Sequence, residues 1–480
     1  MESIWKKTSE RPRASEGIPE QEADAVIIGG GMAGILTGWF LKKQGINVMI
    51  LEANEIGSGQ TGNTTAKVTS QHGLIYDKLL VSMGKEKALQ YARANEEAIG
   101  CYKNIIDELQ IDCAWERCPA YLYSINHSEE LRKEADAALK LGINAFYTDQ
   151  TELPFHNAGA VCFQKQARFH PLKFLYAVAG ELKIYEHVRV LDVEENKVIT
   201  ERGNIHASHI IFAVHYPFIN RPGYYFMRMH QERSYVVAVE GAKLLEGMYL
   251  GIDEGGLSFR SYGNDLLVGG GGHRTGENHA GGQYEMLIRQ ARTYWPDCQV
   301  KAQWSAQDCM TLDGVPYIGR FSSETPGWYV ATGFGKWGMT SSMVAARIIS
   351  SAVSGKCDEN ADVFSPLRFT PQASAKNFMK DGIHAAKDLT KRMFASASLE
   401  VEQLKAGHGG IVEYDGEKAG VYKEEDGRLH VVSVKCPHLG CQLEWNPQEK
   451  SWDCPCHGSR FDYEGNLMDN PANAGLDTMK

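Results

Sequence analysis

Two short loops near the C-terminal end constrain the fold of this chain more than any other feature of its sequence. The first loop contains Cys436 and His438, and the second contains Cys454 and His457, so a C-x-H pair and a C-x-x-H pair occur within 22 residues. Two thiolates and two imidazoles form the ligand set of a [2Fe–2S] cluster that is held by cysteines on one iron and by histidines on the other. A structural zinc site is the alternative, because zinc also takes cysteine and histidine ligands.

The neighbouring residues favour the cluster over zinc. Cys441 and Cys456 raise the total to four cysteines and two histidines, which is more than one structural zinc ion needs. The pattern Cys-Pro-His-Leu-Gly-Cys, followed by Cys-Pro-Cys-His-Gly-Ser, resembles that of Rieske iron–sulfur proteins. The resemblance implies four cluster ligands, which are Cys436, His438, Cys454 and His457. It also implies a disulfide between Cys441 and Cys456, as in the Rieske proteins of cytochrome bc complexes.

Three further expectations follow from the same resemblance. Ser459 stands where the bc-type proteins place a hydroxyl that hydrogen-bonds a cluster sulfide, and Asn470-Pro471-Ala472 stands where they have a proline loop that shields the cluster. Phe461 stands where they carry a tyrosine whose hydroxyl points at a ligating sulfur. Because hydrogen bonds to sulfur stabilise the reduced cluster, the loss of this one predicts a potential below that of the bc-type proteins.

A dinucleotide site is predicted near the start of the chain. A short apolar strand at residues 23–28 runs into Gly29-Gly30-Gly31-Met32-Ala33-Gly34, and a helical segment and a second apolar strand then lead to Glu52. This is the G-x-G-x-x-G pattern in its strand–turn–helix–strand setting. Gly29, Gly31 and Gly34 allow a pyrophosphate to approach the helix N-terminus, and Glu52 can accept hydrogen bonds from the adenosine ribose. A glycine-rich turn without a function is the alternative.

Two further motifs identify FAD as the expected dinucleotide. They are a small-residue loop at 57–67 and a pair of segments, 313–319 and 327–339. Both resemble motifs of the D-amino-acid oxidase/glycine oxidase (DAO) family of flavoproteins, and the resemblance covers residues 20–370. It implies cofactor-binding positions at Ser58, Gly59, Thr64, Thr65, Ala66, Val188, Gly333, Gly335, Gly338, Met339 and Thr340. Ala306 stands where relatives attach FAD covalently, so we expect FAD to be bound non-covalently.

The length of 480 residues predicts two or three domains. We expect residues 1–370 to form an α/β FAD-binding Rossmann-type domain with an interleaved α+β substrate domain, as in the DAO family. Residues 371–400 are expected to form a helical connector, and residues 401–480 a small all-β Rieske domain. The glycine run at 269–273 follows a strand, but no apolar-periodic helix follows it, so we interpret it as a turn without a nicotinamide-nucleotide site.

Charge and apolar patterning exclude several classes of function. A net charge of −10 at pH 7 argues against a general nucleic-acid binder, which needs a basic face. No run approaches the 18 apolar residues of a membrane-spanning helix, and residues 1–17 lack the apolar core of a secretory signal. We therefore expect a cytoplasmic protein without a membrane span.

The two cofactors together predict an enzyme that converts two-electron chemistry into single-electron transfer. A flavin takes two electrons as a hydride, whereas an iron–sulfur cluster passes one electron at a time. We expect an FAD-dependent dehydrogenase that oxidises an amine or a related C–H donor and exports electrons through the Rieske cluster to an external acceptor. The alternatives are a reductase whose electrons enter at the cluster, and an electron-transfer module or redox sensor without an organic substrate.

A few residues are candidates for substrate contact. Amino-acid-oxidising members of the DAO family carry an arginine that pairs with the substrate carboxylate, and the matching position here is Asp308. A carboxylate there predicts a cationic, amine-like substrate, and the alternative is that Asp308 caps a turn. His72, His273, Tyr235 and Trp337 are weaker candidates for the substrate face of the flavin, because a lone histidine or aromatic residue more often packs in the core.

Overall fold

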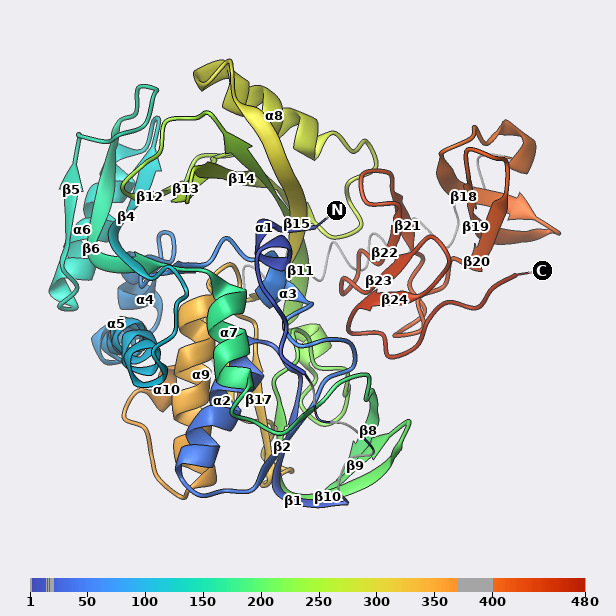
Figure 1. Ribbon diagram of the computed structural model, residues 1–480, viewed down its shortest axis with the longest axis horizontal. Coiled ribbons are helices and arrows are strands. Elements are labelled where there is room, and N and C mark those ends of the chain that lie inside the picture. The colour runs from blue at the N-terminus through green and yellow to red at the C-terminus, as the bar shows by residue number, and fades with distance from the viewer. Residues whose placement is uncertain (1, 14, 16, 18–20, 369–399, 480) are drawn as a thin grey trace.

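A computed structural model describes residues 2–13, 15, 17, 21–368 and 400–479. The N-terminal domain, up to residue 368, contains two large sheets with helices packed around them, and the small C-terminal domain, residues 400–479, lies against one side of it (Figure 1). The predicted connector helix at 371–400 lies outside the described residues, except for residue 400.

The first sheet of the N-terminal domain is the predicted Rossmann-type sheet. Its parallel strands are β1 (Glu22–Ile28), β2 (Val48–Leu51), β7 (Ile184–Tyr185), β10 (Gly203–Phe212) and β17 (Trp328–Thr332). The antiparallel strands β8 (Val190–Glu194), β9 (Lys197–Thr200) and β16 (Tyr317–Arg320) complete it. Helix α2 (Met32–Lys43) connects β1 to β2, which confirms the predicted strand–turn–helix–strand unit. Every residue of β2 is buried, as in parallel strands that are covered on both faces.

Helices cover one face of this sheet. Alternate residues of β1, such as Ala25 and Ile27, share a buried apolar cluster with α2, α5 (Gly84–Leu109), α7 (Pro171–Ala179) and α9 (Gly338–Val353). Helix α7 begins at Pro171, and the His170 ring accepts a hydrogen bond from the Lys173 amide. The remaining helices are α1 (Ile4–Lys7), α3 (Gln60–Asn63), α4 (Tyr76–Ser82), α6 (Ser128–Lys140), α8 (Gln283–Tyr294), α10 (Ala361–Phe364) and the 3-10 turns η1 (Tyr225–Met227) and η2 (Val401–Gln403).

The second sheet of the N-terminal domain runs in the order β15-β11-β14-β13-β12-β4-β6-β3, and β5 pairs with β6. Its strands are β3 (Lys67–Val68), β4 (Glu116–Ser124), β5 (Ala145–Thr148), β6 (Gly159–Arg168), β11 (Met229–Glu240), β12 (Met248–Gly251), β13 (Ser258–Tyr262), β14 (Asp265–Arg274) and β15 (Gln299–Thr311). Because its segments come from between those of the first sheet, the predicted interleaving of the two sheets is confirmed.

The interpretation of residues 269–273 as a turn is wrong. These residues belong to β14, where Gly270 pairs with Tyr235 of β11 next to a β-bulge. A Cβ on Gly270 would lie 2.9 Å from the side chain of Leu257 and 3.2 Å from that of Leu287 in α8. The glycines therefore mark a bulged strand against which other side chains pack closely.

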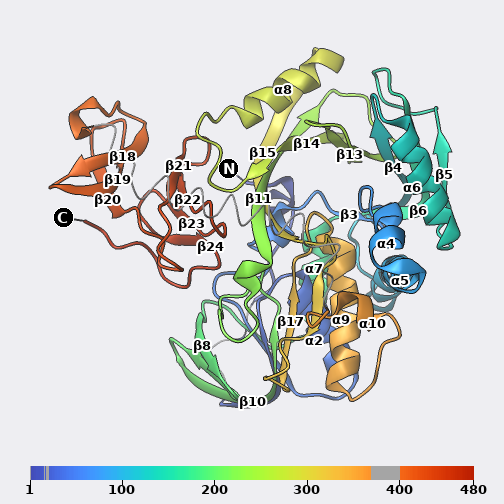
Figure 2. The same ribbon diagram turned by 180° about the vertical axis from the view of Figure 1, so that it is seen from behind.

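The C-terminal domain consists of two small antiparallel sheets, as predicted. One contains β18 (Gly409–Tyr414), β19 (Glu417–Lys423) and β20 (Leu429–Ser433), and the other contains β21 (Glu444–Asn446), β22 (Ser451–Asp453), β23 (Arg460–Asp462) and β24 (Leu467–Asp469). The β21–β24 sheet lies nearer the N-terminal domain, and the β18–β20 sheet lies farther out (Figures 1 and 2). Within the described ranges, no helix has the length and apolar character needed to cross a bilayer.

Candidate functional site

A cavity of about 260 Å³ lies where the parallel strands of the first sheet end. Its wall includes Gly29 and Gly31 after β1, Glu52 after β2, Ala213 after β10 and Gly333 after β17. The carboxyl ends of parallel strands are the usual place for a dinucleotide in such a sheet.

The geometry of the glycine turn fits a dinucleotide. Gly29 has φ +112°, and a Cβ on Gly34 would lie 2.0 Å from the Gly29 carbonyl oxygen, so any larger residue would push the turn away from the helix. The Glu52 carboxylate lines the cavity and accepts hydrogen bonds from the Gly30 amide at 2.7 Å and the Asn54 amide at 2.8 Å. Burial raises the pKa of Glu52. These features leave the N-terminus of α2 open to a pyrophosphate, as the motif predicts.

The other predicted FAD contacts fall into two groups. Those on the cavity wall are Ser58, Gly59, Thr64, Val188, Gly333, Gly335, Gly338 and Met339. Thr65, Ala66 and Thr340 are not part of the wall: the carbonyls of Thr65 and Ala66 accept hydrogen bonds from Arg260, and the Thr340 hydroxyl donates one to the Thr69 carbonyl at 3.1 Å. Their roles toward FAD stay predictions.

None of the four weaker candidates for substrate contact, His72, His273, Tyr235 and Trp337, lines the cavity. His72 is buried; its Nδ1 lies 2.6 Å from the Tyr91 hydroxyl, and its ring stacks on Trp337 with centroids 4.7 Å apart. Burial lowers the pKa of His72 to about 3, so this imidazole is neutral at physiological pH. His273 lies 3.0 Å from the Tyr235 hydroxyl. These contacts give the side chains packing partners, and a catalytic role for them stays a prediction.

Asp308 lies on the cavity wall and is paired with a cation of the same chain. It belongs to β15, opposite Glu232 of β11, so the alternative that it caps a turn is wrong. Lys336, which also lines the cavity, places its Nζ 2.8 Å from Asp308 and 3.2 Å from Glu232. Desolvation would lower the pKa of Lys336, but the two carboxylates raise it above its usual value. A hydrogen bond from His230, with Lys336 nearby, lowers the pKa of Glu232 to about 2.

The four predicted cluster ligands converge in the C-terminal domain. The rings of His438 and His457 are 4.9 Å apart, and the thiols of Cys436 and Cys454 hydrogen-bond each other, which lowers the pKa of Cys436 to about 7. Both histidines have a buried Nδ1 without a hydrogen-bond partner. Burial lowers the pKa of His438 to about 4 and that of His457 to about 3, so both imidazoles are neutral and can ligate iron. The orphaned Nδ1 atoms fit a [2Fe–2S] cluster between the two loops.

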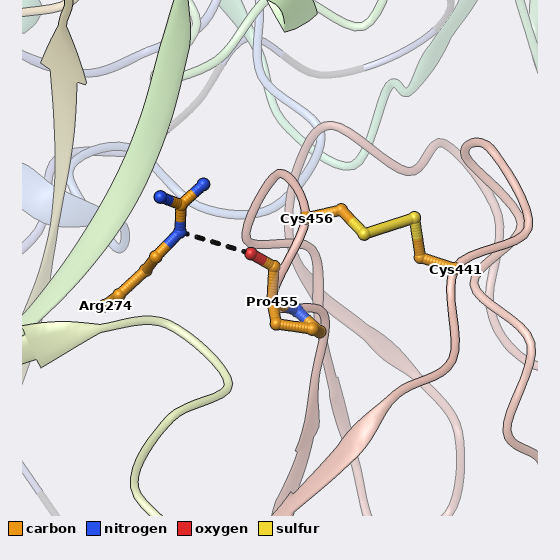
Figure 3. Close-up of a disulfide and its surroundings, with 4 residues drawn as sticks. All are labelled: Arg274, Cys441, Pro455 and Cys456. Carbon is orange, nitrogen blue, oxygen red and sulfur yellow. Dashed lines mark hydrogen bonds between the residues drawn. A yellow bond between two sulfur atoms is a disulfide. The ribbon is translucent and has the colours of Figure 1, made fainter. Parts of the chain in front are cut away.

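The predicted disulfide is present. Cys441 and Cys456 are bonded and join the two cluster loops (Figure 3). The sulfur of Cys454 lies within 4.8 Å of both of these sulfurs, but a disulfide offers no thiolate, so this trio is not a zinc site. The Ser459 hydroxyl is buried; it hydrogen-bonds the Cys436 thiol and accepts a bond from the Ala472 amide at 2.9 Å.

The cavity and the cluster loops adjoin each other across the domain boundary. Residues 467–470 and Asn473 of the C-terminal domain form part of the cavity wall. Gln307 lines the cavity and donates a hydrogen bond to the Gly458 carbonyl at 2.7 Å. Gln231 donates to the carbonyls of His457 and Asn470, each at 2.8 Å. Arg274 donates to the Pro455 carbonyl at 3.4 Å (Figure 3). The N-terminal domain thus holds the second cluster loop by its backbone.

Sequence reasoning missed several of these residues. Gln231 and Gln307 occupy ordinary strand positions and carry no motif, and Lys336 stands inside the motif at 327–339 without a signal of its pairing. His215, which lines the cavity after β10, was likewise not predicted. The pairing of β11 with β15 places Gln231 and Gln307 in neighbouring strands, and this pairing has no signal in the sequence.

The chain belongs to the FAD dependent oxidoreductase (DAO) family, whose model matches residues 24–352, and residues 396–480 match the Rieske [2Fe-2S] domain. It is therefore an FAD-dependent oxidoreductase with a Rieske iron–sulfur domain. The chain is 38% identical to YhfW of Bacillus subtilis (strain 168), which is named as a Rieske 2Fe-2S iron–sulfur protein, over 98% of this chain and 96% of that one.

More distant relatives match the N-terminal part. The gamma-glutamylputrescine oxidoreductase of Escherichia coli (strain K12) is 22% identical over 72% of this chain and 87% of its own length. The crystal structure of glycine oxidase from Geobacillus kaustophilus superimposes with a TM-score of 0.62 at 20% identity, and the match covers 73% of this chain and all of that one. This likeness confirms the DAO-type fold.

Proposed function

We propose that the protein is a dehydrogenase that oxidises an amine or a related C–H donor at FAD and sends the electrons singly through the Rieske cluster to an external acceptor. The observation that carries the proposal is the shared cavity wall, to which residues 467–470 and Asn473 of the Rieske domain contribute. When bound, the flavin supplies two-electron chemistry and the cluster supplies one-electron transfer. A flavin cavity closed by the iron–sulfur domain supports electron exchange within one chain.

A short bonded path supports the same proposal. Asn470 lines the cavity, and Ala472, two residues later, donates its amide proton to the Ser459 hydroxyl. That hydroxyl hydrogen-bonds the thiol of the cluster ligand Cys436. The proline loop expected to shield the cluster therefore also connects the flavin cavity to the cluster loops.

The charges at the cavity support a cationic substrate. Asp308 and Glu232 share one ammonium, that of Lys336, so two carboxylates face one lysine. The Ser234 hydroxyl donates a further hydrogen bond to Asp308 at 2.7 Å. An acidic group of this kind attracts an ammonium and repels a carboxylate. The E. coli relative named for gamma-glutamylputrescine, which is an amine, supports the same substrate class.

Anaerobic screening of amines and amino acids tests the proposed reaction. A true substrate bleaches the flavin and then produces the EPR signal of the reduced Rieske cluster. If no organic donor bleaches the flavin, but reduction of the cluster leads to reduction of the flavin, the electrons run in the opposite direction and the protein is a reductase. If neither occurs, the result favours the third alternative, in which the protein is an electron-transfer module or a redox sensor.

A single substitution at Asp308 tests the preference for a cationic donor. Asp308→Asn leaves Lys336 with one carboxylate instead of two, so KM for a cationic donor should rise at least about tenfold, which corresponds to about 1.4 kcal/mol. The Ser234→Ala variant removes only a hydroxyl that hydrogen-bonds the same carboxylate and should change KM less. An unchanged KM in Asp308→Asn would remove Asp308 from the substrate site.

The cellular location is also part of the proposal. Nine of the eleven cysteines are unpaired, which supports a reducing compartment such as the cytoplasm. Fractionation of cells that express the tagged chain tests this, and recovery with the periplasmic or secreted fraction would contradict it.

A further inference from the structure

A segment of the N-terminal domain covers the imidazole edge of the Rieske centre, which is the side formed by the rings of His438 and His457. This segment, residues 220–228, follows β10 and contains η1. The Asn220 side-chain oxygen lies 2.8 Å from Nε2 of His438. The Phe226 ring packs edge-on against both ligand rings, with centroids 6.3 Å from His438 and 5.8 Å from His457.

Contacts within the N-terminal domain hold this segment in place. The Arg228 guanidinium donates hydrogen bonds to the carbonyls of Gly223 and Pro366, each at 2.8 Å. It also stacks over the rings of Tyr225 and Tyr317, 4.6 and 4.7 Å from their centroids. The Tyr225 hydroxyl donates to the Phe321 carbonyl at 2.8 Å. These contacts within the N-terminal domain therefore hold Asn220 and Phe226 in place against the two histidines.

The hydrogen bond to Asn220 determines the protonation pattern of His438. An amide oxygen can only accept, so Nε2 must carry the proton, and the lone pair is left on Nδ1. Nδ1 of His438 is the buried ring atom without a partner. The bond therefore orients the nitrogen that has a free lone pair toward the position of the cluster.

We propose that Asn220 is a positioning residue that fixes the tautomer and orientation of the cluster ligand His438 and lowers the reduction potential of the cluster, while Phe226 closes the imidazole edge against external partners. An acceptor on the remote N–H makes an imidazole a stronger donor to its metal, and a stronger donor stabilises the ferric state. Because the N-terminal domain of the same chain occupies the imidazole edge, an external redox partner contacts the Rieske domain at another surface. The inference rests on the contacts of Asn220 and Phe226 with the two ligand histidines, and it does not depend on the substrate or on the direction of electron flow.

A pair of variants with opposite predicted effects tests this role. Asn220→Leu has nearly the same size and removes the acceptor, so the potential should shift upward. Asn220→Asp keeps an acceptor in place and adds negative charge, so the potential should shift downward. The measurement is an equilibrium redox titration of the cluster by EPR in the full chain without substrate. Pulsed EPR should also show altered nitrogen couplings for one histidine in Asn220→Leu.

Gln448→Leu is the matched control. Gln448 lies at the same domain boundary, outside the cavity wall, and its side-chain oxygen accepts a hydrogen bond from the Gln283 amide at 3.0 Å, but it has no contact with a ligand histidine in the described structure. Its potential and nitrogen couplings should equal those of the unmodified protein. The proposal is overturned if Asn220→Leu leaves the potential unchanged, if Gln448→Leu shifts it equally, or if both Asn220 variants shift it in the same direction. If Asn220→Leu fails to assemble a cluster, the downward shift in Asn220→Asp decides alone.

Discussion

Arg233 of strand β11 and Glu449 of the Rieske domain form an ion pair across the domain boundary, with side chains only 3% and 9% exposed. Arg460 contacts the same carboxylate at 2.8 Å, and Ser305 donates a further hydrogen bond to it at 2.8 Å. Two buried cations from different domains therefore share one carboxylate. This arrangement fixes the Rieske domain against the sheet that also carries Asp308 and Gln307.

Replacing Glu449 by glutamine should weaken this junction strongly. Its removal leaves the buried Arg233 guanidinium without the carboxylate that pairs with it, which typically costs about 3–5 kcal/mol, whereas Arg460 keeps Asp453 and Asp469. Urea unfolding, followed by flavin fluorescence and by the Rieske absorbance, measures the loss. Asp426→Asn is the control, because Asp426 pairs with Arg428 at an exposed position and its loss should cost less than about 1 kcal/mol. Equal stability of the two variants would contradict the buried role of Glu449.

Glu449 should also give the protein a characteristic acid sensitivity. Burial alone would raise its pKa, but Arg233 and Arg460 overcome burial and hold the pKa well below the usual 4.5. Because the folded-state pKa is below the unfolded-state value, the carboxylate contributes its full stability above about pH 4.5, and this contribution is lost as the pH falls toward the folded-state pKa. Unfolding free energies measured between pH 7 and 3 should therefore fall less steeply in Glu449→Gln. Parallel pH profiles would contradict this account.

Gly34→Ala should abolish FAD binding. The new Cβ would lie 2.0 Å from the Gly29 carbonyl oxygen, so the turn at the N-terminus of α2 must open. Visible flavin absorbance after purification measures the effect, and the cluster should still assemble because it lies in the other domain. Gly100→Ala in α5 is the control, because nothing lies within 4 Å of its Cβ position and alanine favours a helix. A yellow Gly34→Ala protein would argue against the predicted dinucleotide turn.

Gln307→Leu should loosen the contact between the flavin cavity and the cluster. The substitution keeps the side chain's bulk but leaves the Gly458 carbonyl without its hydrogen bond at 2.7 Å, a cost of about 1–3 kcal/mol. We expect slower reduction of the cluster by the reduced flavin, with an unchanged rate of flavin reduction by substrate. Double-mixing stopped-flow measurements separate the two steps. An equal slowing of both steps would indicate a general structural defect.

The parts of the fold that depend on local patterns were predictable from the sequence. The glycine turn, Glu52 and the paired cluster loops are contiguous motifs, because close backbone approach and metal ligation each require particular residues at fixed spacing. The run at 269–273 was misinterpreted because glycines that allow close packing in a bulged strand look the same in sequence as glycines in a turn. The pairing of Asp308 with Lys336 was out of reach because it depends on a loop and a strand that meet only in the folded chain. Phe461 is fully buried, and its effect on the potential stays a prediction.

The central claim is that flavin and cluster exchange electrons within one chain. Photochemical reduction of the flavin under anaerobic conditions, with the reduced Rieske cluster followed over time by EPR or circular dichroism, tests it most directly. We predict that the cluster is reduced as the flavin is reoxidised, at a rate that does not change when the protein is diluted. A cluster that stays oxidised beside a reduced flavin, or a rate proportional to protein concentration, would contradict the claim.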